Sequence, residues 1–99
     1  MNIEVKRNGT SLTITADGRL DTETSPELET AIKNNIEGVT RLTFDFRNLE
    51  HLTSSGLRVL VAAQRIMDKQ GEMVILPVTE AVRDVFALTG MLDIFTVLD

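Results

Sequence analysis

The chain has 99 residues, of which 42% are hydrophobic and 25% are charged. This composition predicts one globular domain over residues 1–99 rather than a disordered chain or a fibrous repeat. The absence of cysteine excludes disulfides, thiolate metal sites and a cysteine nucleophile, and it favours a reducing compartment, the cytoplasm. A net charge of −5 with scattered basic residues argues against a nucleic-acid binder, and no apolar run reaches the ~20 residues that span a bilayer.

The first two expected elements are strands. Apolar residues alternate with polar ones from Ile3 to Lys6 and again over residues 11–16, and the tight-turn pair Asn8-Gly9 lies between the two runs. We therefore expect the chain to open with an antiparallel hairpin.

A helix and a third strand are expected next. The segment Thr24-Ser25-Pro26-Glu27 offers a capping oxygen, a proline that suits the first helical turn and an early carboxylate, and Gly38 ends the helical periodicity. Alternation over residues 39–46 then predicts a strand with one buried face. Residues 48–52 are expected to be a connection.

The C-terminal half is expected to contain two helices around a buried strand. The apolar track over residues 55–70 predicts the most buried helix, and residues 72–76 predict a strand buried on both faces. A helix capped by Thr79 and ended by Gly90 should follow. The apolar tail over residues 91–98 is expected to form a short turn or helix and an edge strand.

This order of elements predicts an α/β fold with a mixed sheet of about four strands and three to four helices. After the antiparallel hairpin, the strands should be parallel and joined by helical crossovers, so that their carboxyl ends share one edge of the sheet. The loops that leave this edge should gather Asp21, Ser55 and Thr79 on one surface. Open α/β sheets usually bind their ligands at such an edge.

The helix start Thr53-Ser54-Ser55-Gly56 has two interpretations. In the first, one serine hydroxyl caps free backbone N–H groups and the other is solvated. In the second, a serine of the first turn is a place for a phosphate, which would spare the fold but disturb a contact surface. Gly56 fits both, because its missing side chain lets a backbone or a partner approach closely.

Catalytic and metal sites are not favoured. Ser55 lacks a Gly-x-Ser-x-Gly elbow, and His51 is expected to be a surface residue of the connecting loop rather than a base or a metal ligand. Asp45 is expected to hold a loop by accepting backbone N–H groups, whereas for Asp21 loop structure and partner contact both remain open. We expect no enzyme activity, no metal and no cofactor.

Three stretches resemble the STAS domain family, and within it the stand-alone bacterial anti-sigma factor antagonists. They are Gly18-Arg19-Leu20-Asp21 with the helix start Thr24–Leu28, Leu42–Phe46 with Leu52–Leu57, and Val82–Gly90. The resemblance covers nearly the whole chain and has the same order of elements.

The resemblance implies a protein that binds an anti-sigma factor with serine kinase activity of the GHKL type and thereby frees the sigma factor. It also implies that phosphorylation of Ser55 abolishes this binding, with Ser54 as the cap and a serine phosphatase as a further candidate partner. The residues assigned to the partner surface are Asp21, Thr22, Thr53, Ser54, Ser55, Gly56, Pro77 and Thr79.

The sequence departs from the family pattern at Thr53, where many phosphorylated members have aspartate. Either kinase recognition is weaker, or this surface binds its partner without being modified. The alternative function is that of a STAS-type structural or regulatory subunit that docks on a transporter or a lipid-export ATPase without phosphorylation.

Overall fold

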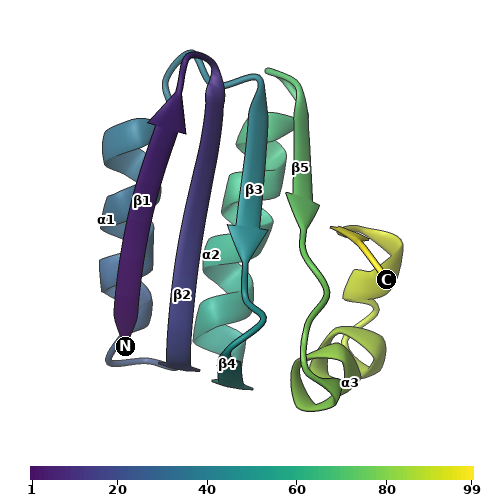
Figure 1. The fold of residues 1–99 in the computed structure, drawn as a ribbon. Coiled ribbons are helices and arrows are strands. Elements are labelled where there is room, and N and C mark those ends of the chain that lie inside the picture. Colours follow the sequence, from purple (N-terminus) through teal and green to yellow (C-terminus); the bar gives the residue numbers. More distant parts are fainter.

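An antiparallel hairpin forms one side of the sheet in the computed structural model, which describes residues 1–99. Its strands are β1 (Asn2–Asn8) and β2 (Ser11–Leu20), and Gly9 between them takes the left-handed φ of +64° that favours glycine. The strands β3 (Arg41–Asp45), β5 (Glu72–Ile75) and β6 (Thr96–Val97) follow in that order, each parallel to its neighbour. The expected mixed sheet is confirmed (Figure 1).

The sheet has six strands, which corrects the expectation of about four. Residues 48–52, expected to be a connection, contain the strand β4 (Leu49–Leu52), which pairs in parallel with the end of β2. Leu49 and Leu52 are buried and the two residues between them are exposed, so the segment lacks the alternation that predicts a strand. The expected edge strand of the tail is β6.

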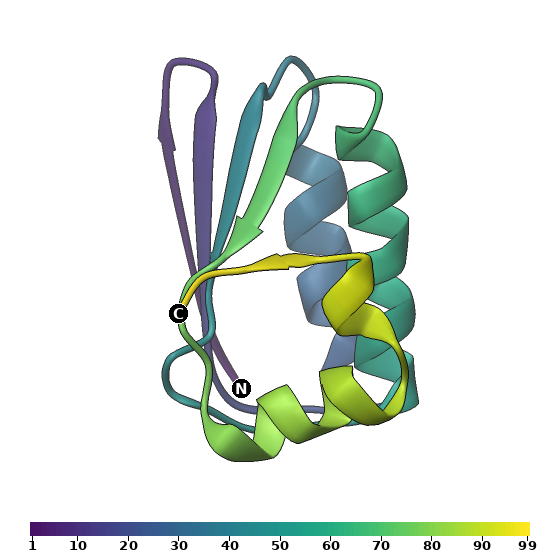
Figure 2. The same ribbon diagram turned by 90° about the vertical axis from the view of Figure 1, so that its right-hand side faces the viewer.

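Two helices, α1 (Ser25–Asn35) and α2 (Ser54–Met67), cover the same face of the sheet (Figure 2). The third, α3 (Glu80–Leu88), lies beyond the end of the strands and leads into the short 3₁₀ helix η1 (Met91–Asp93). This number of helices agrees with the prediction. None of the helices has the length and apolar character that a membrane crossing requires.

The core fills the space between the sheet and these helices. All four phenylalanines are buried. The rings of Phe44 and Phe46 are stacked with centroids 5.0 Å apart, and those of Phe86 and Phe95 meet edge to face at 5.4 Å. The first pair lies where β3 ends, so the strand end that leads toward α2 is firmly anchored.

Candidate functional site

The helix α2 begins without a side-chain cap. Thr53 is the N-cap residue, but its N–H and its hydroxyl both point to the carbonyl oxygen of Leu20, at 3.0 and 3.4 Å. Ser54 is the first helical residue and is exposed, so the expectation that Ser54 is the cap is wrong. Thr53 takes the cap position, and its side chain instead ties the helix start to the end of β2.

Gly56 allows the start of α2 to lie directly on the sheet. A Cβ atom at this position would be 2.7 Å from Cγ of Leu20 and 2.7 Å from Cδ1 of Leu52, closer than side chains pack. The close approach that Gly56 permits is therefore to core leucines of β2 and β4. The helix start is fixed in place, and the hydroxyl of Ser55 is fixed with it.

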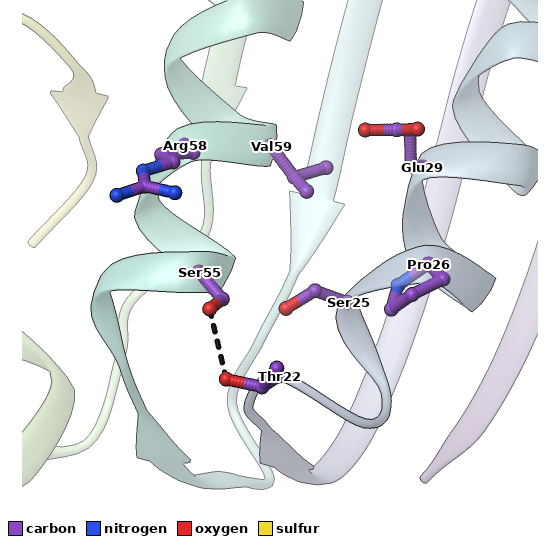
Figure 3. Close-up of a pocket in the computed structure, with 7 residues that line it drawn as sticks. All are labelled: Thr22, Ser25, Pro26, Glu29, Ser55, Arg58 and Val59. Atoms are coloured by element: carbon purple, nitrogen blue, oxygen red, sulfur yellow. Dashed lines mark hydrogen bonds between the residues drawn. The ribbon is translucent and has the colours of Figure 1, made fainter.

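The hydroxyls of Ser55 and Thr22 form a hydrogen bond at 3.0 Å (Figure 3). Thr22 is exposed and belongs to the loop between β2 and α1, whereas Ser55 is half-buried. This is the one side-chain hydrogen bond of Ser55, so no general base contacts the hydroxyl. It joins two loops that leave the same edge of the sheet, as the connection rules predict.

Asp21 shapes the loop that carries Thr22. Its Oδ1 accepts hydrogen bonds from the N–H groups of Glu23 and Thr24, at 3.0 and 3.1 Å. The N–H of Thr24 is the main cause that lowers the pKa of Asp21, and Arg19, 3.8 Å away, adds to it. The carboxylate therefore serves the structure of the loop.

Thr24 contributes to this loop rather than to a helix cap. Its hydroxyl donates to the carbonyl of Arg19 at 2.7 Å and accepts from the N–H of Asp21 at 2.9 Å. The expected capping bond at the start of α1 is absent. Ser25 donates to the carbonyl of Asp21 at 2.5 Å, which fixes the first turn of α1 beside Thr22.

A pocket of about 220 Å³ lies between the first turns of α1 and α2, with Ser55 in its wall. Its lining residues, shown in Figure 3, are Thr22, Ser25, Pro26, Glu29, Ser55, Arg58 and Val59. Ser25, Glu29 and Arg58 were not among the site residues predicted from the sequence. Helical spacing is the signal that points to them, since Arg58 follows Ser55 by three residues and Glu29 follows Ser25 by four.

Thr79 and Pro77 do not line this pocket. Thr79 caps α3 as expected, because its hydroxyl accepts from the N–H of Val82 at 3.4 Å and donates to the carbonyl of Leu49 at 3.1 Å. Pro77 is exposed in the loop between β5 and α3. Both residues belong to the segment that leads from the end of β5 to α3, and the bond from Thr79 to Leu49 places this segment next to β4.

Asp45 holds the turn after β3, as expected. Both of its oxygens accept from the guanidinium of Arg47, at 3.0 and 2.9 Å, and Oδ1 accepts from the N–H of Arg47 at 3.3 Å. The side-chain hydrogen bonds of Arg47 are the main cause that lowers the pKa of Asp45. His51 is exposed as expected, but in β4 rather than in a loop, and no cluster of three metal-ligating side chains is present.

A mixed sheet with two helices on one face and a half-buried serine at an uncapped helix start defines this molecule as a small α/β domain with a polar site at the carboxyl edge of its sheet. The sequence matches the STAS domain family over residues 2–99. The chain therefore belongs to the STAS domain family.

Its relatives include anti-sigma factor antagonists. The chain is 33% identical over 82 residues to BtrV of Bordetella bronchiseptica, a protein assigned as an anti-sigma factor antagonist, and the match covers 81% of this chain and 71% of BtrV. A crystal structure of an anti-sigma factor antagonist from Mycobacterium paratuberculosis is similar with a TM-score of 0.88 and 26% identity, covering 97% of this chain and 83% of that one.

The anti-sigma factor antagonist SpoIIAA has the same fold. Its unphosphorylated form gives a TM-score of 0.78 with 20% identity, covering 99% of this chain and 88% of that one. The phosphorylated form of the Bacillus protein gives 0.77 with 20% identity, covering 99% and 92%. The same fold therefore exists with and without a phosphate in that protein.

Proposed function

We propose that this chain is an anti-sigma factor antagonist that binds an anti-sigma factor and is switched off by phosphorylation of Ser55. Membership of the STAS family and the likeness to BtrV support the partner class. The observation that carries the switch is the position of Ser55, whose accessible hydroxyl lies at the wall of the pocket on a helix start fixed by Gly56.

The proposed modification needs a kinase and ATP. The bond between Ser55 Oγ and the γ-phosphorus forms, the bond from that phosphorus to the ADP oxygen breaks, and the hydroxyl proton passes to a base of the kinase. The anti-sigma factor itself, with GHKL-type kinase activity, is the proposed donor enzyme. A serine phosphatase would restore the hydroxyl.

The phosphate acts on the contact surface rather than on the fold. It adds a charge of about −1.5 to −2 at neutral pH. In a docked complex this charge must be desolvated or paired, which disfavours binding. Folding is spared because Ser55 is only half-buried and its hydroxyl bonds another side chain, not the backbone of the core.

The proposal is of a regulator and not of an enzyme. The absence of a base in contact with Ser55 supports this, since a serine nucleophile needs one. An anti-sigma factor works where transcription takes place, so the proposed site of action is the cytoplasm. The partner surface is proposed to centre on Thr22, Thr53, Ser54 and Ser55, with Pro77 and Thr79 at its border.

The switch is tested by incubating the purified protein with its cognate anti-sigma factor and ATP. We expect a mass gain of one phosphoryl group, mapped to Ser55, and loss of the complex in a binding titration. Ser55→Ala should bind without being modified, and Ser55→Asp should bind more weakly. The matched control is Ser11→Ala, because Ser11 is an exposed serine at the opposite end of β2, outside the proposed surface, and this variant should behave as wild type.

Thr53 is compatible with weaker kinase recognition or with a surface that binds its partner without being modified, and the presence or absence of phosphate on Ser55 decides between the two. Complex formation without any phosphate on Ser55 would retain the antagonist and reject the switch. If neither the wild type nor any variant binds the anti-sigma factor, the antagonist function itself is wrong.

A further inference from the structure

Arg58 is an arginine without a partner at the wall of the pocket. Five other basic side chains form ion pairs with carboxylates, namely Arg19, Lys33, Arg41, Arg47 and Arg83. Arg58 is exposed, and its side chain takes part in none of the five ion pairs and in no side-chain hydrogen bond of the structure. Its guanidinium, with five N–H donors, is free to bind an anion.

Arg58 is placed to reach a group on Ser55. The two residues are three apart on α2, a spacing at which side chains lie next to each other on a helix. Figure 3 shows Arg58 one turn above Ser55 on the same helix. A guanidinium matches the geometry of phosphate oxygens and can donate two hydrogen bonds to them.

The pocket has room for a phosphoryl group. Its volume of about 220 Å³ is several times the ~30 Å³ that one water molecule occupies in the liquid. Thr22 already bonds Ser55 Oγ at 3.0 Å and, after modification, its hydroxyl can donate to a phosphate oxygen instead. Figure 3 shows Thr22 below Ser55 and Arg58 one turn above it. In this view the guanidinium is on the side of α2 away from α1, so it must turn about its side-chain torsions to meet a phosphate on Ser55.

The other charged groups near the pocket are on α1. Glu29 lies in the opposite wall and is paired with Lys33 at 3.2 Å, which reduces the repulsion that its carboxylate exerts on a phosphate. Arg58 is thus the one unpaired charge of the lining, and its sign is opposite to that of a phosphate.

We propose that Arg58 binds the phosphoryl group of phosphorylated Ser55 within this pocket, with Thr22 as a second donor. The inference deepens the proposed function and rests on it. Arg58 acts as a positioning residue, which stabilises the dianionic form of the phosphate on the surface of α2. The modified state then carries its full charge at neutral pH.

The test places phosphoserine at position 55 during translation, so that no kinase is needed. The second ionisation of the phosphate is titrated by ³¹P NMR in the otherwise wild-type chain and in Arg58→Gln. We expect Arg58→Gln to raise this pKa by about 0.3 to 0.7 units, the range set by exposed ion pairs. Folding of each variant is checked by circular dichroism.

The matched control is Arg65→Gln. Arg65 is also exposed and unpaired on α2, but it is seven residues further on, roughly 10 Å along the axis, and should leave the pKa unchanged. Glu29→Gln removes a negative charge from the pocket wall and should lower the pKa. Equal shifts in Arg58→Gln and Arg65→Gln, or no shift in Arg58→Gln, would overturn the proposal.

The two proposals fail separately. Phosphoserine at position 55 can pair with Arg58 even if no kinase modifies the chain, in which case the pKa shift is seen and the mass gain is not. Conversely, a kinase could modify Ser55 while Arg58→Gln leaves the pKa of the phosphate unchanged. That result would support the switch and reject the pairing of the phosphate with Arg58.

Discussion

Gly56 is the residue of the site at which a side chain is least tolerated. Replacing it by alanine brings a Cβ to 2.7 Å from two buried leucines, Leu20 and Leu52. Overpacking of this kind costs about 1 to 3 kcal/mol, and the gain of about 1 kcal/mol in helix propensity offsets part of it. We therefore predict that Gly56→Ala lowers the free energy of unfolding by up to about 2 kcal/mol, measured by urea denaturation.

The control for this prediction is Ala62→Ser on the same helix. Ala62 is exposed, so its replacement should change the stability by no more than about 0.5 kcal/mol. A Gly56→Ala variant as stable as the control would mean that the leucines yield to the new methyl group.

The lowered pKa of Asp45 leads us to predict that the stability of the fold depends on pH. Its pKa is lowered in the folded state, so the ionised carboxylate stabilises the fold. This contribution is complete above the unfolded pKa of about 3.9 and is lost as the pH falls through the lower folded value. Asp45→Asn should therefore be less stable than wild type at about pH 7, and the difference should shrink by about pH 3.

Urea denaturation of both proteins across this pH range measures the effect. Asp84→Asn is the control, because Asp84 is exposed and belongs to none of the five ion pairs. The pH dependence would not come from Asp45 if the free energies of unfolding of Asp45→Asn and wild type differed by the same amount at both ends of the pH range.

At the scale of elements, Arg7 joins the hairpin to the end of α1. Its guanidinium donates to three carbonyl oxygens, those of Gly9 at 3.1 Å, Asn35 at 2.6 Å and Glu37 at 3.0 Å. Asn35 is the last residue of α1 and Glu37 lies just beyond it, at the helix end where a positive charge is favourable. We predict that Arg7→Ala lowers the free energy of unfolding by about 0.5 to 1.5 kcal/mol.

Arg7→Lys tests whether the geometry or the charge matters. Lysine keeps the charge but lacks the planar set of donors, so its stability should fall between those of wild type and Arg7→Ala. Thermal or urea unfolding compares the three proteins. Equal stability of the two variants would assign the whole effect to the guanidinium geometry.

Elements with a clear period were predictable from the sequence, and elements that depend on local contacts were not. The alternation before Phe46 and the helical track from Ser55 both gave the correct element. β4 has only four residues, and its two middle side chains are exposed, so tertiary pairing with β2 decides its conformation. The same holds for Thr24, whose hydroxyl has several backbone partners within reach and bonds Arg19 rather than capping α1.

The site was predictable as a surface but not as a pocket. Connection rules place the loops of Asp21 and Ser55 at one edge of the sheet, and the structure bears this out. The contact between Thr22 and Ser55 depends on the turn that Asp21 holds, which no periodicity encodes. Arg58 is an exposed residue on a helix, and such positions look alike in sequence.

At the scale of the whole molecule, the strands differ in how well they are protected. β2 and β3 each have neighbours on both sides, whereas β1 is at one edge and the two-residue β6 at the other. We predict that amides of Leu42 and Phe44 exchange more slowly than those of β6 by more than about an order of magnitude. Hydrogen exchange followed by NMR measures this, and uniform exchange over all strands would contradict it.

The close packing of the start of α2 on Leu20 and Leu52 has a consequence for how long a change at Ser55 would last. A helix start held this tightly cannot change its shape in response to the hydroxyl beside it. If Ser55 is modified as proposed, the record is a covalent bond rather than a conformation, so thermal motion does not erase it. Only an enzyme can reset such a mark, and only a molecule that touches the surface can read it.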